Sequence, residues 1–91
     1  MARVIVTAQV EDSVKWEEGF RTHGALFNDM TVTAIQFTTT DENEVAIDFE
    51  VDDLDNYFKI FEAPVTAEAM AFDGVKRETV KVFVLDKEFD L

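Results

Sequence analysis

The segment EVAIDFEVDDLDNYFKIF, residues 44–61, combines two kinds of hydrophobic period. Its first half alternates apolar and polar side chains, which is the period of a half-buried strand. The apolar members of that half are Val45, Ile47, Phe49 and Val51. In its second half the apolar residues recur at helical spacing, at Leu54, Tyr57, Phe58 and Phe61. Because Asp52 or Asp53 stands between the halves and can cap a helix, the segment predicts a strand that leads directly into a helix.

Three further segments have the composition of strands. Residues 3–10 alternate in the same way, and residues 31–40 are rich in β-branched side chains, which favour strands. Residues 78–86 are a third candidate near the end of the chain. Together with residues 44–51 they predict a sheet of four strands.

Helical segments separate these strands. Asp12 or Ser13 can cap a first helix, which we expect to run to about Asn28. Pro64 is expected to break the second helical region into two pieces, because a proline ring clashes with the preceding turn. The order βαββαβ predicts an α+β fold of the ferredoxin-like type, with an antiparallel sheet.

The composition is that of a small globular protein. The chain has 91 residues, of which 47% are apolar, so we expect one domain over residues 1–91 with a single hydrophobic core. No apolar run approaches the ~20 residues that span a bilayer, and the N-terminus lacks the pattern of a signal peptide. With no cysteine to form disulfides, the sequence predicts a cytoplasmic protein.

The charge narrows the range of partners. Twenty acidic and eight basic residues give a net charge of −12, which opposes binding to nucleic acid and to anionic membranes. We therefore predict neither as a partner. One histidine and no cysteine do not make a metal site, and no glycine-rich phosphate loop is present, so neither a metal nor another cofactor is predicted.

The face of the sheet away from the helices is also expected to be apolar. On it we place Ile5, Ile35, Phe37, Phe83 and Leu85. Burial of each such side chain is worth roughly 1.5–3 kcal/mol, so this face should be covered. We expect the same face of a second copy to cover it, which makes the protein a homodimer.

Charged side chains alternate with the apolar ones on the central strands. Asp48 and Glu50 fall on the face away from the core, where a catalytic pair of carboxylates and a structural ion pair are both conceivable. Since buried carboxylates need partners, we expect cross-strand pairing with Arg3 or Lys81.

The sequence resembles that of a known superfamily in three places. These are the run of Trp16, Phe20 and His23, the segment NEVAIDFEVDDL (43–54) and the segment MAFDGVKRETVKVFVLD (70–86). Together they are similar to small dimeric α/β-barrel (ABM-like) proteins of unassigned function. The resemblance implies that two βαββαβ chains pack sheet against sheet. The wider superfamily includes cofactor-free quinone-forming monooxygenases, haem-degrading monooxygenases, muconolactone isomerases and stress-responsive barrels.

The catalytic signatures of these enzymes are only partly present. Haem-degrading members carry an asparagine on the first strand, where this chain has Val-Thr-Ala at residues 6–8. Their tryptophan and haem-ligating histidine come later in the chain, whereas Trp16 and His23 both fall on the first helix. Quinone-forming members use Asn, Trp, Tyr and Arg. Trp16, Tyr57 and Arg21 are of the right types, but Arg21 is expected to point away from the pocket.

His23 is the residue on which the prediction of function depends most. On a continuous helix it lies on the same stripe as Trp16, Phe20 and Phe27. It is either a buried, neutral histidine bonded to a backbone carbonyl or a threonine of the sheet, or a titratable group in the wall of an apolar pocket. In the second case a neutral imidazole can act as a base, with Trp16, Phe20, Phe27 and Tyr57 as aromatic walls that bind substrate.

Two glycines lie close to His23 in the sequence. Gly19 and Gly24 each cost the helix about 1 kcal/mol relative to alanine. We expect the missing side chains either to let the helix approach the sheet or to leave a void beside His23.

Two functions remain open at this point. One is a cofactor-free monooxygenase- or isomerase-type enzyme that binds a small aromatic or apolar molecule and uses His23 as its acid–base group. The other is a non-catalytic, stress-associated or ligand-binding homodimer with a filled core. An enclosed cavity reached by the imidazole would favour the first, and a filled interior the second.

Overall fold

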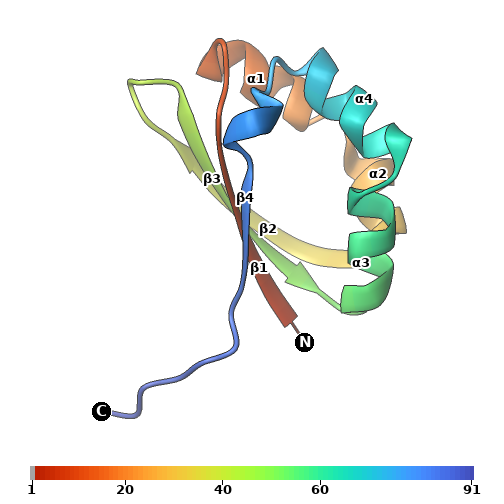
Figure 1. Cartoon of the computed structure of the whole chain (residues 1–91), viewed down its shortest axis with the longest axis vertical. Helices are drawn as coiled ribbons and strands as arrows, with labels where there is room; N and C mark the ends of the chain where they lie inside the picture. The colour runs from red at the N-terminus through yellow and green to blue at the C-terminus, as the bar shows by residue number, and fades with distance from the viewer. Residues whose placement is uncertain (1) are drawn as a thin grey trace.

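The computed structural model describes residues 2–91 and has the predicted order of elements (Figure 1). The elements are β1 (Ala2–Gln9), α1 (Ser13–Phe20), α2 (Gly24–Asp29), β2 (Val32–Thr39), β3 (Glu44–Val51), α3 (Leu54–Phe61), α4 (Pro64–Phe72), η1 (Arg77–Thr79) and β4 (Lys81–Val84). Each helical region of the βαββαβ pattern is divided into two helices. The predicted α+β, ferredoxin-like class is confirmed.

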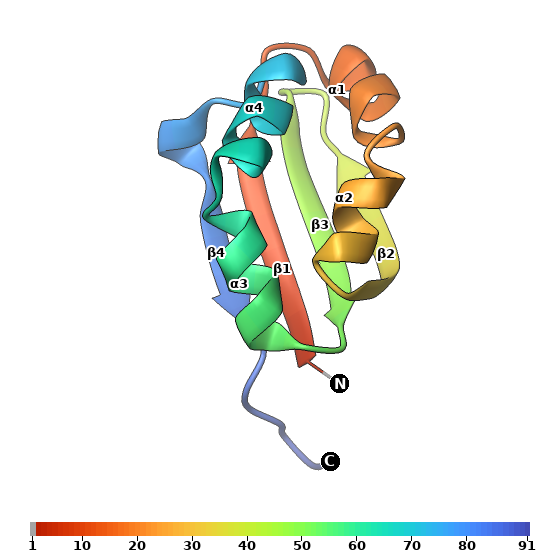
Figure 2. The same cartoon turned by 90° about the vertical axis from the view of Figure 1, so that its right-hand side faces the viewer.

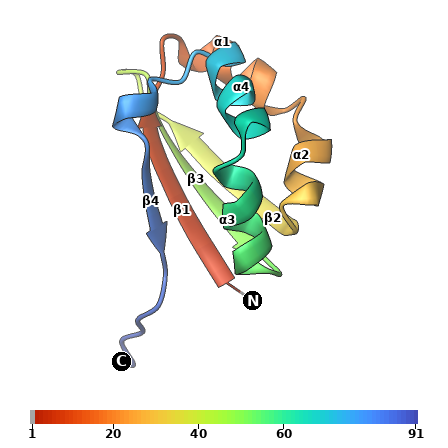
Figure 3. The same cartoon turned by 45° about the vertical axis from the view of Figure 1, so that its right-hand side comes forward.

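The four strands form one antiparallel sheet in the order β2-β3-β1-β4. All four helices lie on one side of it (Figure 3). Seen from the helix side, α1 and α2 lie toward β2, and α3 and α4 lie toward β4 (Figure 2). The core fills the space between helices and sheet. Its largest contribution from the sheet is the alternating buried set of the two central strands, Val4, Val6, Val45, Ile47, Phe49 and Val51.

Local sequence signals set the helix boundaries as predicted. The Asp12 carboxylate accepts hydrogen bonds from the backbone N–H groups of Val14 and Lys15, and thereby caps α1. Asp53 caps α3 in the same way. Ala63 has extended backbone angles (φ −76°, ψ 156°) and Pro64 is the first residue of α4, so the predicted break is confirmed.

The prediction of one continuous first helix to Asn28 is wrong. The helix ends at Phe20, and a tight turn over residues 21–23 precedes α2. In this turn the Thr22 N–H and hydroxyl both bond to the Gly19 carbonyl, at 2.9 and 2.6 Å. A side chain that competes for a helix carbonyl, next to two glycines, weakens the helix at this point. His23 therefore lies at the start of α2, and its direction does not follow from a continuous helix.

The assignment of Ile35 and Phe37 to the open face of the sheet is also wrong. They pair with Phe49 and Ile47 on the helix side, and the Phe37 ring centroid lies 5.6 Å from that of Trp16. A β-bulge between Val32 and Ala34 adds one residue to this strand and inverts its alternation.

The open face is consequently less apolar than predicted. Ile5, Phe83 and Leu85 remain on it, beside β4, and the last two are 51% and 53% exposed. Toward β2 it carries polar groups, among them the predicted ion pair of Arg3 with Asp48. The apolar surface is thus confined to one half of this face.

The end of the chain differs from the predicted strand at residues 78–86. Arg77–Thr79 form a short 3-10 turn, so β4 begins only at Lys81. After β4 the chain leaves the body of the protein without regular structure (Figure 1). Within residues 2–91, none of the helices has the length and apolar character that a membrane crossing needs.

Candidate functional site

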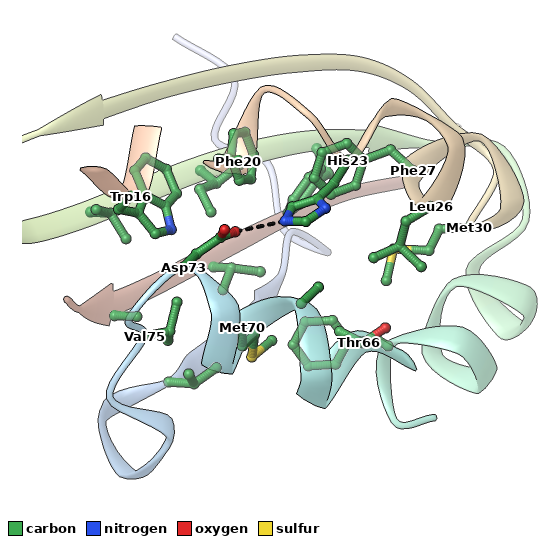
Figure 4. Close-up of a pocket in the computed structure, with 18 of the residues that line it drawn as sticks. Trp16, Phe20, His23, Leu26, Phe27, Met30, Thr66, Met70, Asp73 and Val75 are labelled. Atoms are coloured by element: carbon green, nitrogen blue, oxygen red, sulfur yellow. Dashed lines mark hydrogen bonds and ion pairs between the residues drawn. The ribbon is translucent and has the colours of Figure 1, made fainter. Parts of the chain in front are cut away.

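An apolar cavity of about 70 Å³ lies between the two helix pairs, above the sheet (Figure 4). Helices α1 and α2 form one wall and α3 and α4 the other, while β1 and β3 contribute the floor. The lining side chains that matter most below are Trp16, Phe20, His23, Phe27, Tyr57, Thr66 and Asp73. A concave, mainly apolar site with a few polar groups is the usual form of a small-molecule site.

The five residues predicted from the sequence are brought together here. Trp16, Phe20, His23, Phe27 and Tyr57 all line the cavity. The rings of Trp16 and Phe20 stack with centroids 4.6 Å apart, and Phe27 follows Phe20 at 5.0 Å. His23 meets Phe27 edge-on, at 6.5 Å. Their functional roles stay predictions.

The partner of His23 is a residue that the sequence did not indicate. Its Nε2 lies 2.8 Å from Oδ2 of Asp73, the residue at the end of α4. The prediction of a backbone carbonyl or a sheet threonine as the partner of His23 is therefore wrong. The two side chains are 19% and 4% exposed, so Asp73 is buried and His23 is partly buried. It joins the two walls of the cavity (Figure 4).

Gly19 provides the space for this pair. A Cβ atom at Gly19 would lie 2.0 Å from Oδ1 of Asp73, which no real pair of such atoms allows. We expected the glycine either to let the helix approach the sheet or to leave a void, and it does neither. It accommodates a carboxylate from α4. The glycine within an amphipathic helix was the only sequence signal of this contact.

Burial governs the electrostatics of the pair. Burial raises the pKa of Asp73, and the charge and hydrogen bond of His23 partly offset that rise. Oδ1 of Asp73 is buried with no hydrogen-bond partner among residues 2–91. If the Asp73 carboxylate is ionised it can only accept, and Nε2 of His23 is then the donor of their hydrogen bond. A neutral ring of that tautomer has its lone pair on Nδ1. Nδ1 lies on the side of the ring away from Asp73 (Figure 4).

Tyr57 is the second polar group of the cavity wall without a partner. It is fully buried, and its hydroxyl has no hydrogen-bond partner within residues 2–91. Burial raises the pKa of this phenol above its ordinary value, so the hydroxyl keeps its proton at neutral pH. By contrast, the hydroxyl of nearby Thr66 donates to the Ile60 carbonyl at 2.6 Å.

The size of the cavity restricts what it can hold. Its volume of about 70 Å³ is roughly half that of an engineered protein cavity, about 150 Å³, that binds benzene. A compact molecule fits as the protein stands, whereas a larger one requires the helix pairs to part. Within residues 2–91 there is no group of three acidic or histidine side chains that could hold a metal ion.

Comparisons with known proteins identify the fold. The sequence matches no protein-family model and no curated protein. A candidate antibiotic biosynthesis monooxygenase from Bordetella bronchiseptica has a similar structure, with a TM-score of 0.76 at 12% identity over 97% of each chain. SnoaB, a cofactor-independent oxygenase from Streptomyces nogalater, gives a TM-score of 0.72 at 13% identity, over 99% of this chain and 95% of SnoaB. The ABM-like resemblance seen in the sequence is confirmed at the level of the fold.

Proposed function

We propose that this protein is a cofactor-free enzyme that removes a proton from a compact, mainly apolar molecule, with His23 as the base. The observation that carries the proposal is the 2.8 Å contact between His23 Nε2 and Asp73 Oδ2 in the wall of an apolar cavity. A histidine oriented by a buried carboxylate is an arrangement that supports general base catalysis.

The pair assigns a role to each of its members. Asp73 accepts a hydrogen bond from Nε2–H, so it fixes the tautomer that leaves Nδ1 as the base. When Nδ1 takes a proton from the substrate, the carboxylate stabilises the imidazolium that forms. Asp73 is therefore a positioning residue, and His23 is the catalytic one. The aromatic side chains Trp16, Phe20 and Phe27 supply the apolar contacts to the substrate.

Two reaction classes share this first step. In an isomerisation the proton returns to a different carbon of the substrate. In a monooxygenation the carbanion reacts with molecular oxygen, and a methylene group plus O₂ gives a carbonyl group plus water. The second class is supported by the fold that this chain shares with SnoaB, an oxygenase that needs no cofactor.

A non-catalytic role is the second candidate, and the cavity volume favours it. At about 70 Å³ most of the interior is filled. In that case the protein binds a small ligand without converting it. The two candidates differ in whether a proton leaves the bound molecule.

Deuterium exchange into small carbon acids tests the proposal. Hydroxyacetone and acetylacetone would be incubated with the protein in D₂O, and loss of the C–H signal followed by ¹H NMR against buffer containing equimolar imidazole. We expect the wild type to exceed imidazole and the smaller compound to show the larger acceleration. Exchange at the imidazole rate with both compounds would refute the proposed catalysis. Non-catalytic ligand binding would then remain as the candidate function.

The positioning role of Asp73 gives a matched pair of variants. Asp73→Asn should lower the exchange rate by about 10²-fold or more, because an amide can hold the ring in the wrong tautomer. Asp41→Asn removes the same charge from an exposed turn and should leave the rate unchanged. Equal rates in the two variants would exclude a role for Asp73.

We also propose that the protein is a homodimer joined through the open face of the sheet. Ile5, Phe83 and Leu85 support this, because a contiguous apolar patch exposed to water usually marks a contact surface. Light scattering at micromolar concentration should give twice the chain mass, and Phe83→Glu should shift the protein toward the monomer. A wild-type monomer at this concentration would contradict the proposal.

A further inference from the structure

We propose that the Tyr57 hydroxyl donates a hydrogen bond to a substrate oxygen, the one on which negative charge develops when His23 removes the proton. The inference rests on the proposed function and deepens it, because it names the substrate class as a compact enolisable carbonyl compound. Tyr57 lines the same cavity as His23 but comes from the opposite wall.

The first support is an unmet hydrogen bond. Buried hydroxyl groups in native proteins nearly always have a partner, and an exception calls for an explanation. Tyr57 is fully buried, and no atom of residues 2–91 accepts its proton. The ring itself is held tightly, because it stacks on Phe61 at 5.6 Å and meets Phe49 at 5.8 Å. A rigid donor without an acceptor is a group that a ligand can satisfy.

The second support is chemical. The hydroxyl remains protonated at neutral pH, so it can donate but does not compete with His23 as a base. When Nδ1 removes a proton next to a carbonyl group, the C–H bond breaks and its electron pair moves to form a C=C bond. The carbonyl oxygen then carries the negative charge. A hydrogen-bond donor in a dry cavity stabilises such an oxyanion much more than water does.

The unpartnered hydroxyl of Tyr57 narrows the ligand further, because it offers a donor to a carbonyl oxygen. Oδ1 of Asp73 packs against Gly19 instead. Hydroxyacetone matches the Tyr57 donor, since it is a compact molecule with a carbonyl oxygen. Methallyl alcohol has nearly the same shape, but a C=CH₂ group replaces the carbonyl, and it therefore serves as the control ligand.

Thermal stability provides the first test. Tyr57→Phe removes an unpaired hydroxyl, so the melting temperature of the ligand-free protein should stay unchanged or rise. Thr66→Val removes a paired hydroxyl from the same cavity and should lower the melting temperature by about 4–8 °C. A comparable decrease for Tyr57→Phe would mean that its hydroxyl has an internal partner, and would overturn the inference.

Ligand binding and exchange provide the second test. Tyr57 is the only tyrosine, so a ¹³Cζ label gives one NMR signal that reports on its hydroxyl. Hydroxyacetone should shift this signal, and Tyr57→Phe should weaken its binding about fivefold to tenfold. Methallyl alcohol should bind wild type and Tyr57→Phe equally. The deuterium exchange rate of hydroxyacetone should fall about 10²-fold in Tyr57→Phe.

The outcomes separate this inference from the proposed function. If the wild type catalyses exchange and Tyr57→Phe does so equally well, the inference is wrong and the base role of His23 stands. A second outcome is that the wild type catalyses no exchange but Tyr57→Phe selectively loses hydroxyacetone binding. Tyr57 then donates a hydrogen bond to a ligand that the protein binds without converting it, and the enzymatic proposal fails. Equal binding of both ligands to both proteins overturns the inference.

Discussion

Replacement of Gly19 by alanine is expected to destabilise the protein by about 1–3 kcal/mol, the range found for overpacked cores. The new Cβ would lie 2.0 Å from Oδ1 of Asp73, and that carboxylate cannot move without losing its contact with His23. Alanine is favoured over glycine inside a helix by about 1 kcal/mol, which acts in the opposite direction. The clash should outweigh this gain, because the buried Asp73 carboxylate is hydrogen-bonded to His23.

Gly24→Ala is the matched control for this variant. Gly24 lies at the start of α2, and a Cβ there would meet no atom within 4 Å. This variant should be neutral or more stable by up to about 1 kcal/mol. Urea denaturation of both variants measures the difference. A Gly19→Ala protein as stable as Gly24→Ala would show that the close approach of α1 to Asp73 is wrong.

Replacement of His23 by glutamine is expected to reduce deuterium exchange into hydroxyacetone by about 10²–10⁴-fold, the range for loss of a general base. The glutamine amide can still donate a hydrogen bond to Asp73, but it has no basic nitrogen. The stability of the protein should therefore change little while the exchange is lost. NMR exchange rates and urea denaturation on the same samples measure the two effects.

His23→Ala separates the structural contribution of the histidine from its chemistry. Alanine leaves the Asp73 carboxylate without any of its polar partners, so this variant should lose about 1–3 kcal/mol of stability as well as the exchange. If both variants keep the wild-type rate, His23 is a structural residue. If His23→Gln loses the rate but His23→Ala retains it, the base role is equally untenable.

Most of the secondary structure was predictable from the sequence, since it depends on neighbours within one or two turns. The alternation in residues 44–51 and the caps at Asp12 and Asp53 act on their own segments, so the prediction of these elements is confirmed. The same holds for the break at Pro64, because the proline ring itself excludes helical geometry before it.

The errors occurred where two local signals compete. The β-branched residues of β2 fit either phase of the sheet, and only a bulge between Val32 and Ala34 decides which side chains face the helices. Similarly, the apolar stripe of residues 14–28 favours one helix, while Gly19, Thr22 and Gly24 favour an interruption. In the structure the interruption prevails, and Thr22 bonds to the Gly19 carbonyl at the break.

The sequence by itself determined the order of the elements and the hydrophobic faces of β1, β3 and α3, because each follows from the spacing of residues along one segment. Only the tertiary structure decided which group is the hydrogen-bond partner of His23 Nε2. Asp73 lies fifty residues further along the chain, and its distance from His23 depends on how α4 packs relative to α2. A hydrogen bond between two helices that are not adjacent in sequence is fixed by the packing of the whole core, and no local pattern encodes it.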